Sequence, residues 1–470
     1  MGDENQLLLN ASTGSTFSTK GDSQTRSIFC SKVWTPFLLF TIGCFTVFCA
    51  YNGSQNIASS LDILDVNKLD GGIALGILYS CFTLTCFVAP VVVNAVGAKN
   101  CVCIQFCFLS LYALSYLYPR WYTLYISAAL VGIGAGPMWV SQGLYMSALS
   151  TRYRSLLVKH GNLHDLQEDY SGLFQGYFFG IFQLTQVFGN LVSGYIEHVA
   201  NVKTLFLVYF GMIIFGILLL LYVPKLKEFK DSSSSDVVKN VISNIEQIQA
   251  SYQDENENDT QTRNPFDMDS ASAREDQQDG ADLWTTVSVL KNKRVLFILP
   301  AFFAAGLEQS VMFGDVTTYI KRTFGHANIG YIMAIFGAGD AIASAIVGKL
   351  SDVFGKKVFL ILACLIQGGC CTYFFVFKGS GMTFLLMSVI AFAWGVADGI
   401  WNSCGSALCA DTFEDATQRR GLFSVFRLMQ SVAMMAYFVK PGATSFIPKL
   451  IFLAAVLGVS LLGIIRFKRR

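Results

Sequence analysis

The side chains best placed for chemistry in this chain are ionisable groups inside long apolar stretches, where a charge is costly and is usually paired or functional. All of them lie in the second half of the chain: Glu308, Asp315, Asp340, Asp398 and Arg427. At the 1.5 Å rise of a helix, Asp340 and Asp398 would each lie about 15 Å above the cytosolic end of a helix, and Arg427 about 9 Å above its own. One arginine can therefore reach either carboxylate. This intramembrane charge network is either a buried ion pair or a site that responds to protons or cations.

A short basic segment, residues 348–357, joins two apolar stretches and is the second candidate site. We predict a tight loop in which glycines permit a sharp turn and close backbone approach. Its aspartate can lie against the positive terminus of a helix from the opposite half, and its lysines hold the loop in the cytosol. The residues of this predicted gate loop are Gly348, Asp352, Gly355, Lys356 and Lys357. The alternative is a chance basic turn between two helices.

Neutral polar and aromatic side chains are candidates for the lining of a central cavity. The polar ones lie in the first half, where they either face the cavity or bond one helix to another. Two tryptophans at matching positions of the two halves either face the cavity or pack in the core. These candidates are Asn52, Gln55, Trp139, Gln142, Gln175, Gln183, Asn190 and Trp401.

Signals of an enzyme, a metal site or a nucleic-acid site are missing from the sequence. It contains no nucleophile elbow, phosphate-binding loop or metal triad, so we expect no catalytic residues and no cofactor. His160 and His164 have a metal-like spacing, but they stand in a polar segment and fit a solvated pair better. No basic patch interleaved with aromatic residues suggests nucleic acid. The thirteen cysteines lie in or beside apolar stretches, as expected of small buried thiols.

The composition places these candidate residues in a lipid bilayer. Hydrophobic residues make up 53% of the chain and charged residues 14%, which is more apolar surface than a soluble core could bury. A membrane-spanning helix needs about 20 apolar residues. Twelve such stretches occur, at 34–58, 71–94, 101–118, 121–148, 171–196, 204–223, 294–319, 328–349, 357–377, 381–408, 421–440 and 445–465. We therefore predict an all-α integral membrane protein with twelve transmembrane helices.

Polar segments divide the chain into predicted domains. These are a disordered cytosolic tail (1–33), a six-helix bundle (34–223), a disordered cytosolic insertion (224–293), a second six-helix bundle (294–466) and a basic cytosolic tail (467–470). The insertion is rich in Asp, Glu and Asn and poor in aromatic residues, which predicts disorder. The first 33 residues are polar, so we expect no cleaved signal peptide. Lys and Arg concentrate on the side of both termini, which the positive-inside rule assigns to the cytosol.

The two halves of the sequence echo one another. The matching segments are 89–99 with 348–357, 132–139 with 394–401, and 172–174 with 421–423. Asn94 stands where Asp352 stands in the second copy, so the first copy lacks the charge. Similar offsets between the segments predict two pseudo-repeat bundles around a central cavity.

These segments also carry a resemblance to a known family. Residues 134–142, 175–183 and 394–401, together with Phe426-Arg427-Leu428, are similar to segments of uncoordinated-93-like (UNC-93-like) proteins, a branch of the major facilitator superfamily. The gate loop resembles the loop between the second and third helices of each half of major-facilitator transporters. The resemblance implies a major-facilitator-like fold.

The resemblance implies more than one possible function. Members of the family are described as potassium-channel regulatory subunits, as chaperones that carry membrane receptors out of the endoplasmic reticulum, and as transporters. The intact motif around Asp352 favours a secondary transporter of a small solute or ion. The loss of charge at Asn94 and the one-sided charge network favour the alternative. That alternative is a non-transporting regulatory subunit of an ion channel, or a trafficking chaperone for a membrane-protein client.

Two short motifs concern the cellular location of the protein. One resembles an acidic dileucine sorting signal, and the other resembles a tripeptide recognised by endocytic adaptor domains. They consist of Asp3, Glu4, Leu7, Leu8 and Leu9, and of Asn264, Pro265 and Phe266. Either match can arise by chance. If they act, coat adaptors are partners and the protein resides on endosomal or lysosome-like membranes; otherwise we expect it at the plasma membrane.

Overall fold

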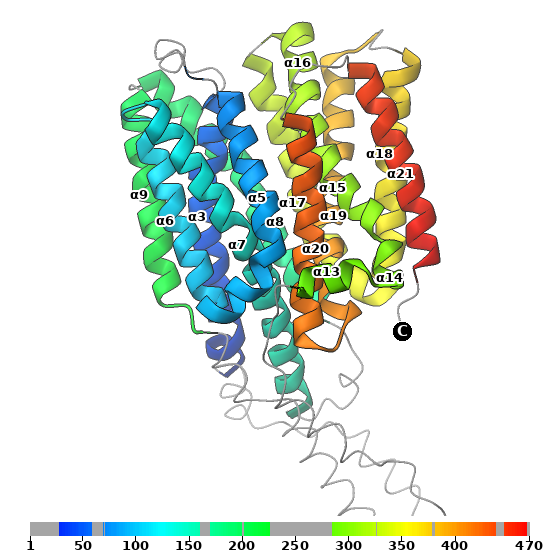
Figure 1. Ribbon diagram of the computed structural model, residues 1–470. Helices are drawn as coiled ribbons and strands as arrows, with labels where there is room; N and C mark the ends of the chain where they lie inside the picture. The colour runs from blue at the N-terminus through cyan, green and yellow to red at the C-terminus, as the bar shows by residue number, and fades with distance from the viewer. Residues whose placement is uncertain are drawn as a thin grey trace, which may run out of the picture.

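The computed structural model describes residues 28–58, 69, 71–159, 170–199, 202–225, 284–325, 327–377, 381–438 and 446–467. Within these residues the regular structure is helical (Figure 1). The two predicted sorting signals, and residues 226–283 of the predicted insertion (224–293), lie outside the described residues.

The first half of the chain forms a group of long helices. A short π-helical turn, η1 (Cys30–Trp34), leads into α3 (Thr35–Ala58). The helices that follow are α5 (Gly71–Val96), α6 (Ala98–Ser115), α7 (Trp121–Lys159), α8 (Ser171–Val199) and α9 (Val202–Leu221). Their facing sides bury one apolar cluster, whose larger members include Phe106, Phe178 and Tyr209.

The second half forms another such group. Two short helices come first, α13 (Thr285–Leu290) and α14 (Lys293–Leu296). Three consecutive helical segments follow: α15 (Leu299–Val311), the π-helical η3 (Met312–Val316) and α16 (Thr317–Phe324). The remaining helices are α17 (Ala327–Phe354), α18 (Lys356–Phe377), α19 (Phe384–Thr412), α20 (Ala416–Phe438) and α21 (Phe446–Arg466). A second buried apolar cluster, which includes Trp394 and Trp401, holds them together.

Ten helices in the described part of the chain are long and apolar enough to cross a membrane. They are α3, α5, α6, α7, α9, α17, α18, α19, α20 and α21. Two predicted spans are not among them. The span at 171–196 corresponds to α8, whose glutamines make it more polar, and the span at 294–319 corresponds to α15, η3 and α16, each shorter than 18 residues.

The outer sides of the helices carry large apolar side chains. Leu84, Leu191 and Leu385 are 68%, 61% and 74% exposed, and many similar residues surround them. Exposed apolar surface of this extent is unusual for a protein in water. Helices also satisfy their backbone hydrogen bonds internally, as a segment in lipid must. The surface therefore suits a bilayer.

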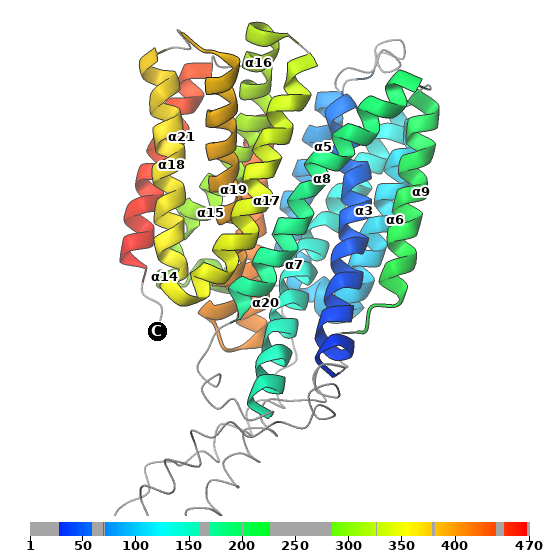
Figure 2. The same ribbon diagram turned by 180° about the vertical axis from the view of Figure 1, so that it is seen from behind.

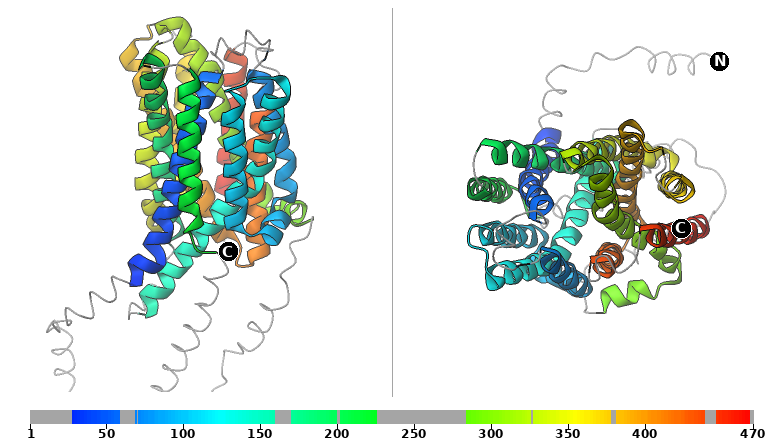
Figure 3. Two further views of the ribbon diagram at one scale, coloured as in Figure 1. Left: turned by 90° about the vertical axis from the view of Figure 1, so that its left-hand side faces the viewer. Right: turned by 90° about the horizontal axis from the view of Figure 1, so that it is seen from above.

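The two halves stand side by side with their long helices roughly parallel (Figures 1 and 2). Viewed from above, the blue-to-green first half lies on one side and the yellow-to-red second half on the other (Figure 3). They meet mainly along two pairs of helices, α8 with α17 and α5 with α20. We call these the α8–α17 seam and the α5–α20 seam.

The predicted gate loop is mostly helical. α17 continues through Asp352 to Phe354, and α18 begins at Lys356. Gly355 alone separates the two helices, with a φ of 90°. Glycine adopts this left-handed conformation without the steric cost that a Cβ would add. The prediction of a sharp turn was thus correct, but the turn is a single residue.

Helical structure extends past two predicted boundaries. α7 continues beyond the predicted span at 121–148 to Lys159. α13 precedes the predicted bundle at 294–466, and its Thr285 and Val289 are buried and face Gly421 of α20. The end of the predicted insertion therefore belongs to the folded part of the chain.

Candidate functional site

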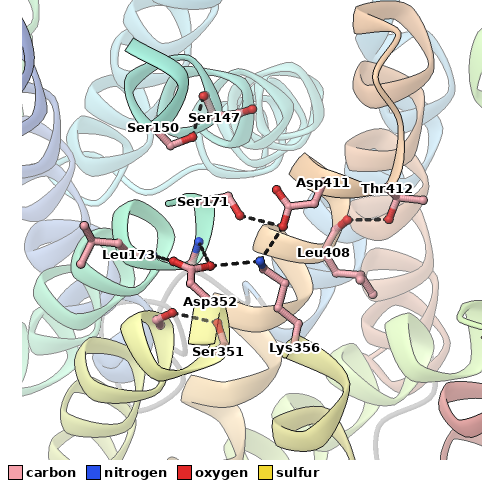
Figure 4. Close-up of polar contacts among 12 residues, drawn as sticks. Ser147, Ser150, Ser171, Leu173, Ser351, Asp352, Lys356, Leu408, Asp411 and Thr412 are labelled. Atoms are coloured by element: carbon pink, nitrogen blue, oxygen red, sulfur yellow. Dashed lines mark hydrogen bonds and ion pairs between the residues drawn. The ribbon is translucent and has the colours of Figure 1, made fainter. Parts of the chain in front are cut away.

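Asp352 joins the two halves at the end of the molecule where α17 meets α18, which we call the Asp352 end (Figure 4). The backbone N–H groups of Gly172 and Leu173 donate to Asp352 Oδ1 (2.9 Å) and Oδ2 (2.8 Å). These amides belong to the first turn of α8, where no carbonyl of the helix accepts from them and the helix dipole favours a negative charge. A carboxylate from one half therefore caps a helix of the other.

Lys356 and Asp411 extend this contact. Lys356 Nζ lies 3.0 Å from Asp352 Oδ1 and 2.6 Å from Asp411 Oδ2, and Ser171 Oγ donates to the same Asp411 oxygen at 2.8 Å. The Lys356 side chain is only 2% exposed. One buried cation therefore lies between two carboxylates inside the contact and offsets part of their charge. We call Asp352, Lys356, Asp411 and residues 171–173 the latch.

Small residues bring α8 and α17 into backbone contact beside the latch. A Cβ added to Gly348 would lie 2.4 Å from the Cα of Gly176 and 2.5 Å from the carbonyl oxygen of Gly172. One added to Gly180 would lie 2.9 Å from the Cβ of Ala345. Small residues at such spacing allow close helix packing in membranes. The α8–α17 seam therefore depends on glycine at several positions.

At the Asp352 end, the α5–α20 seam has an amide where the other seam has its carboxylate. Asn94 Oδ1 accepts a hydrogen bond from Arg420 Nη1 at 2.8 Å. The asparagine is exposed, the arginine is half-buried, and the bond joins a neutral group to a cation. The two seams thus differ in the charge that holds them.

The short helix α13 lies across the α5–α20 seam. Thr286 Oγ1 is 3.2 Å from the carbonyl oxygen of Phe87 and 3.1 Å from Ser424 Oγ, so it can bond to either helix of the seam. Ser424 Oγ in turn donates to the carbonyl oxygen of Cys86. Residues near the end of the predicted insertion (224–293) therefore bridge the two halves.

Three carboxyl groups meet inside the second half: Glu308 of α15, Asp340 of α17 and Asp398 of α19. They are 0%, 1% and 2% exposed, and Asp398 neighbours both of the others. Trp394 Nε1 donates to Glu308 Oε2 (2.6 Å), and Gln309 Nε2 donates to Asp398 Oδ1 (2.9 Å). Like charges this close repel strongly away from water, so protons or a cation must reduce their charge. We call these three residues the carboxyl cluster.

Arg427, which the sequence places within reach of Asp340 or Asp398, is not paired directly with either carboxylate. No ion pair to Asp398 or Asp340 occurs among the residues described in the structure, and Arg427 Nη1 donates instead to Gln430 Oε1 at 2.7 Å. Two glutamines complete a chain to the carboxyl cluster: Gln430 Nε2 donates to Gln309 Oε1 (3.4 Å), and Gln309 donates to Asp398. Arg427 itself is turned toward Trp139 of the first half, with its guanidinium carbon 4.6 Å from the ring centroid.

Asp315 and Trp401 lie apart from these sites. Asp315 Oδ2 is 3.0 Å from Lys449 Nζ, which ties η3 to α21, so Asp315 forms its own ion pair outside the carboxyl cluster. Trp401 Nε1 donates to Gln367 Oε1 at 2.9 Å, and the ring is 2% exposed in the core of the second half. Of the two matching tryptophans, Trp139 therefore contacts the opposite half through Arg427, whereas Trp401 bonds within its own half.

The neutral polar residues of the first half bond one helix to another. Asn52 Nδ2 donates to Thr185 Oγ1 at 2.8 Å, which joins α3 to α8. Gln142 Nε2 donates to Gln175 Oε1 at 3.1 Å, which joins α7 to α8. Gln183 is buried. The side chains of Gln55 and Asn190 lie outside the described residues.

Some residues of the latch and of the glutamine chain were not singled out in the sequence. Asp411 follows the predicted span at 381–408, where a carboxylate is expected to lie in solvent. Gln309 and Gln430 are single neutral residues in apolar stretches, next to or near Glu308 and Arg427. Their proximity to ionisable residues was the available signal, since a buried charge needs polar neighbours.

Comparison with known proteins identifies a family and relatives of this chain. The sequence profile of the family described as "Ion channel regulatory protein UNC-93" matches residues 62–467. Among similar proteins, "Protein unc-93 homolog A" of Xenopus laevis is 26% identical over 447 residues, covering 91% of each chain. "UNC93-like protein 3" of Arabidopsis thaliana is 26% identical over 425 residues, covering 86% of this chain and 79% of that protein.

Solved structures of major-facilitator proteins share the fold. The proton:xylose symporter XylE superposes with a TM-score of 0.65 at 13% identity, covering 93% of this chain and 96% of its own. The human organic anion transporter MFSD10 superposes with a TM-score of 0.59 at 12% identity, covering 92% of this chain and 99% of its own. At these identities the likeness concerns the fold alone.

Proposed function

Because the chain belongs to the UNC-93 family and has the major facilitator fold, we propose that it is a secondary transporter of a small solute or ion. It works by alternating access: the two halves rock against each other around a central site. The latch is the observation that carries this proposal. It joins the halves by hydrogen bonds and ion pairs, which can break and reform without unfolding either half.

Twelve membrane spans in two six-helix bundles complete the architecture. α8 and the combined segment α15–η3–α16 are the two spans beyond the ten candidates, and their polar or irregular composition suits helices that line a moving interface. The bundles comprise residues 34–223 and 294–466 and form two pseudo-repeats. Support comes from the placement of Asp352 and Asn94 at corresponding ends of the two seams.

The carboxyl cluster makes the transporter responsive to protons. Glu308 Oε1 and Asp340 Oδ2 are buried and have no hydrogen-bond partner among the described residues. Each can therefore carry a proton without displacing a donor. Asp398 is connected to Arg427 by hydrogen bonds through Gln309 and Gln430. A change of charge in the cluster therefore alters the hydrogen bonds of Arg427, which lies at the contact between the halves.

Replacing Asp352 with asparagine should loosen the latch and change transport. An amide accepts the two α8 N–H bonds poorly and cannot neutralise Lys356, so hydrogen–deuterium exchange of residues 171–180 should speed up by about tenfold. Proteoliposomes loaded with a pH-sensitive dye and supplied with mixed small metabolites should then show altered proton movement. Asp415→Asn is the matched control, because Asp415 accepts from the backbone N–H of Gln418 in the first turn of α20, a helix cap within one half.

Unchanged exchange in residues 171–180 of Asp352→Asn would mean that the latch does not govern the seam. The second candidate function would then stand. The family description, ion channel regulatory protein, favours that candidate: a non-transporting subunit or chaperone that holds another membrane protein. Affinity purification from native membranes would recover a stoichiometric channel or receptor, and no metabolite would move protons in proteoliposomes.

The Asp352 end and both termini face the cytosol, and the protein resides on endosomal or lysosome-like membranes. η1 and the last turn of α21 lie at the same end of the molecule as α13 (Figure 1).

The acidic dileucine signal acts on the cytosolic side through coat adaptors. An N-terminal epitope tag should therefore be stained only after the plasma membrane is permeabilised, and on internal vesicles. Changing Leu7, Leu8 and Leu9 together to alanine should move the tag to the cell edge; an unchanged distribution would make the match accidental.

A further inference from the structure

Arg427 is a buried cation whose charge is incompletely balanced. Only 3% of the residue is exposed. Its Nη1 donates to the neutral amide of Gln430, and its Nε has no hydrogen-bond partner within the described part of the chain. The carboxylates of the second half are reached only through glutamines, as described above. A guanidinium removed from water needs a negative partner or a full set of acceptors, and here it has neither.

Aromatic rings supply part of the missing stabilisation. The guanidinium carbon of Arg427 lies 4.6 Å from the ring centroid of Trp139, 4.7 Å from that of Phe426 and 5.9 Å from that of Phe179. The face of an aromatic ring attracts a cation. A ring carries no net charge, however, so the positive charge of the arginine persists. The rings therefore hold the arginine in place while no anion is bound.

The position of Arg427 suits a substrate contact. The residue stands eleven positions from each end of α20 and hence midway along it. Trp139 belongs to α7 and Phe179 to α8, so two of the three rings come from the first half. A ligand bound here would touch both halves. A ligand that contacts both can bind one arrangement of the halves better than another, and this difference is what shifts a conformational equilibrium.

The same arginine is linked to the carboxyl cluster. Gln430 accepts from Arg427 Nη1 and donates to Gln309, which donates to Asp398. An anion that accepts the hydrogen bond of Arg427 Nη1 would replace Gln430 as its acceptor. The amide of Gln309 would then lose a partner, and the surroundings of Asp398 would change. Anion binding at the seam is thereby coupled to the charge of the cluster.

We propose that Arg427 is the anion-binding residue of the substrate site, and that the substrate class is a small organic carboxylate with a flat apolar body. Carboxylate oxygens match the two parallel N–H groups of a guanidinium. The flat body lies against the ring of Trp139. This inference rests on the proposed transport function, since it names the substrate class of that transporter.

Benzoate, benzamide and benzamidine test the inference, because they share one shape and differ in charge. The purified full-length protein in detergent is titrated with each, and melting temperature and tryptophan fluorescence are recorded. Benzoate alone should raise the melting temperature and quench the fluorescence. Arg427→Gln should weaken benzoate binding by about 10- to 100-fold, the loss expected for a hydrogen bond to a charged group. Arg322→Gln, which removes an exposed arginine of α16, should leave binding unchanged.

Equal binding of benzoate and benzamide to the parent protein would overturn the inference, and so would full benzoate affinity in Arg427→Gln. The first comparison needs no variant, so it decides even if Arg427→Gln does not fold. Uptake of labelled benzoate into proteoliposomes separates the two proposals. Charge-selective binding without uptake would support the anion site and contradict transport. Absence of binding, with the latch response of Asp352→Asn intact, would contradict the anion site alone.

Discussion

Replacing Gly348 with leucine should separate the two halves at the Asp352 end. A Cβ at this position would lie 2.4 Å from the Cα of Gly176 and 2.5 Å from the carbonyl oxygen of Gly172. Both are backbone atoms, so neither can turn away without moving a whole helix. Overpacking of one methylene costs about 1 to 3 kcal/mol, and leucine adds more than one. We expect a lower melting temperature and faster hydrogen–deuterium exchange in residues 171–180.

Gly369→Leu is the matched control for this substitution. Gly369 is an exposed glycine of α18, and a Cβ there would meet no atom within 4 Å. The same residue change should therefore leave melting and exchange as in the parent. Exchange in α21, which packs on α15 and α18 within the second half, should stay slow in Gly348→Leu. Fast exchange throughout α21 would mean that the glycine supports the fold of the second half instead of the seam.

Asp398→Asn should fold at least as well as the parent, whereas Asp398→Leu should be strongly destabilised. Asp398 Oδ1 accepts from Gln309 Nε2 (2.9 Å) and Asn402 Nδ2 (2.7 Å). An amide oxygen can replace this acceptor, and it also removes one negative charge beside Glu308 and Asp340. Leucine removes the acceptor, which leaves the Gln309 amide without this partner and Asn402 Nδ2 with only the backbone carbonyl of residue 398, at a cost of about 1 to 3 kcal/mol for the lost acceptor. Thermal melting and folded yield in detergent compare the three proteins.

The two substitutions at Asp398 also test how Arg427 is held. The sequence alone suggested a direct pair of Arg427 with Asp398, for which Asp398→Asn would cost about 3 to 5 kcal/mol by leaving a cation unpaired. The observed glutamine chain predicts the opposite sign. If the asparagine variant loses as much stability as the leucine variant, the negative charge of Asp398 is required and the two glutamines do not replace the ion pair.

Local patterns in the sequence were enough to predict which stretches become long apolar helices and which end of α17 carries a helix-capping carboxylate. Both follow from local properties: apolar length for a membrane span, and an aspartate beside glycines and lysines for Asp352. Around Asp352 the sequence nevertheless predicted a loop, whereas α17 remains helical through Phe354. The turn between α17 and α18 needs only the positive φ of Gly355.

Only the tertiary structure decided which buried charges meet. Sequence position sets the depth of Arg427 along its helix, but it does not set how that helix is rotated against its neighbours. A rotation of α20 determines whether Arg427 faces Asp398 or Trp139, and packing against α7 selects Trp139. The latch likewise joins Ser171 to Asp411 across the two halves. Contacts between residues so far apart in the chain depend on how the helices pack, which no local pattern records.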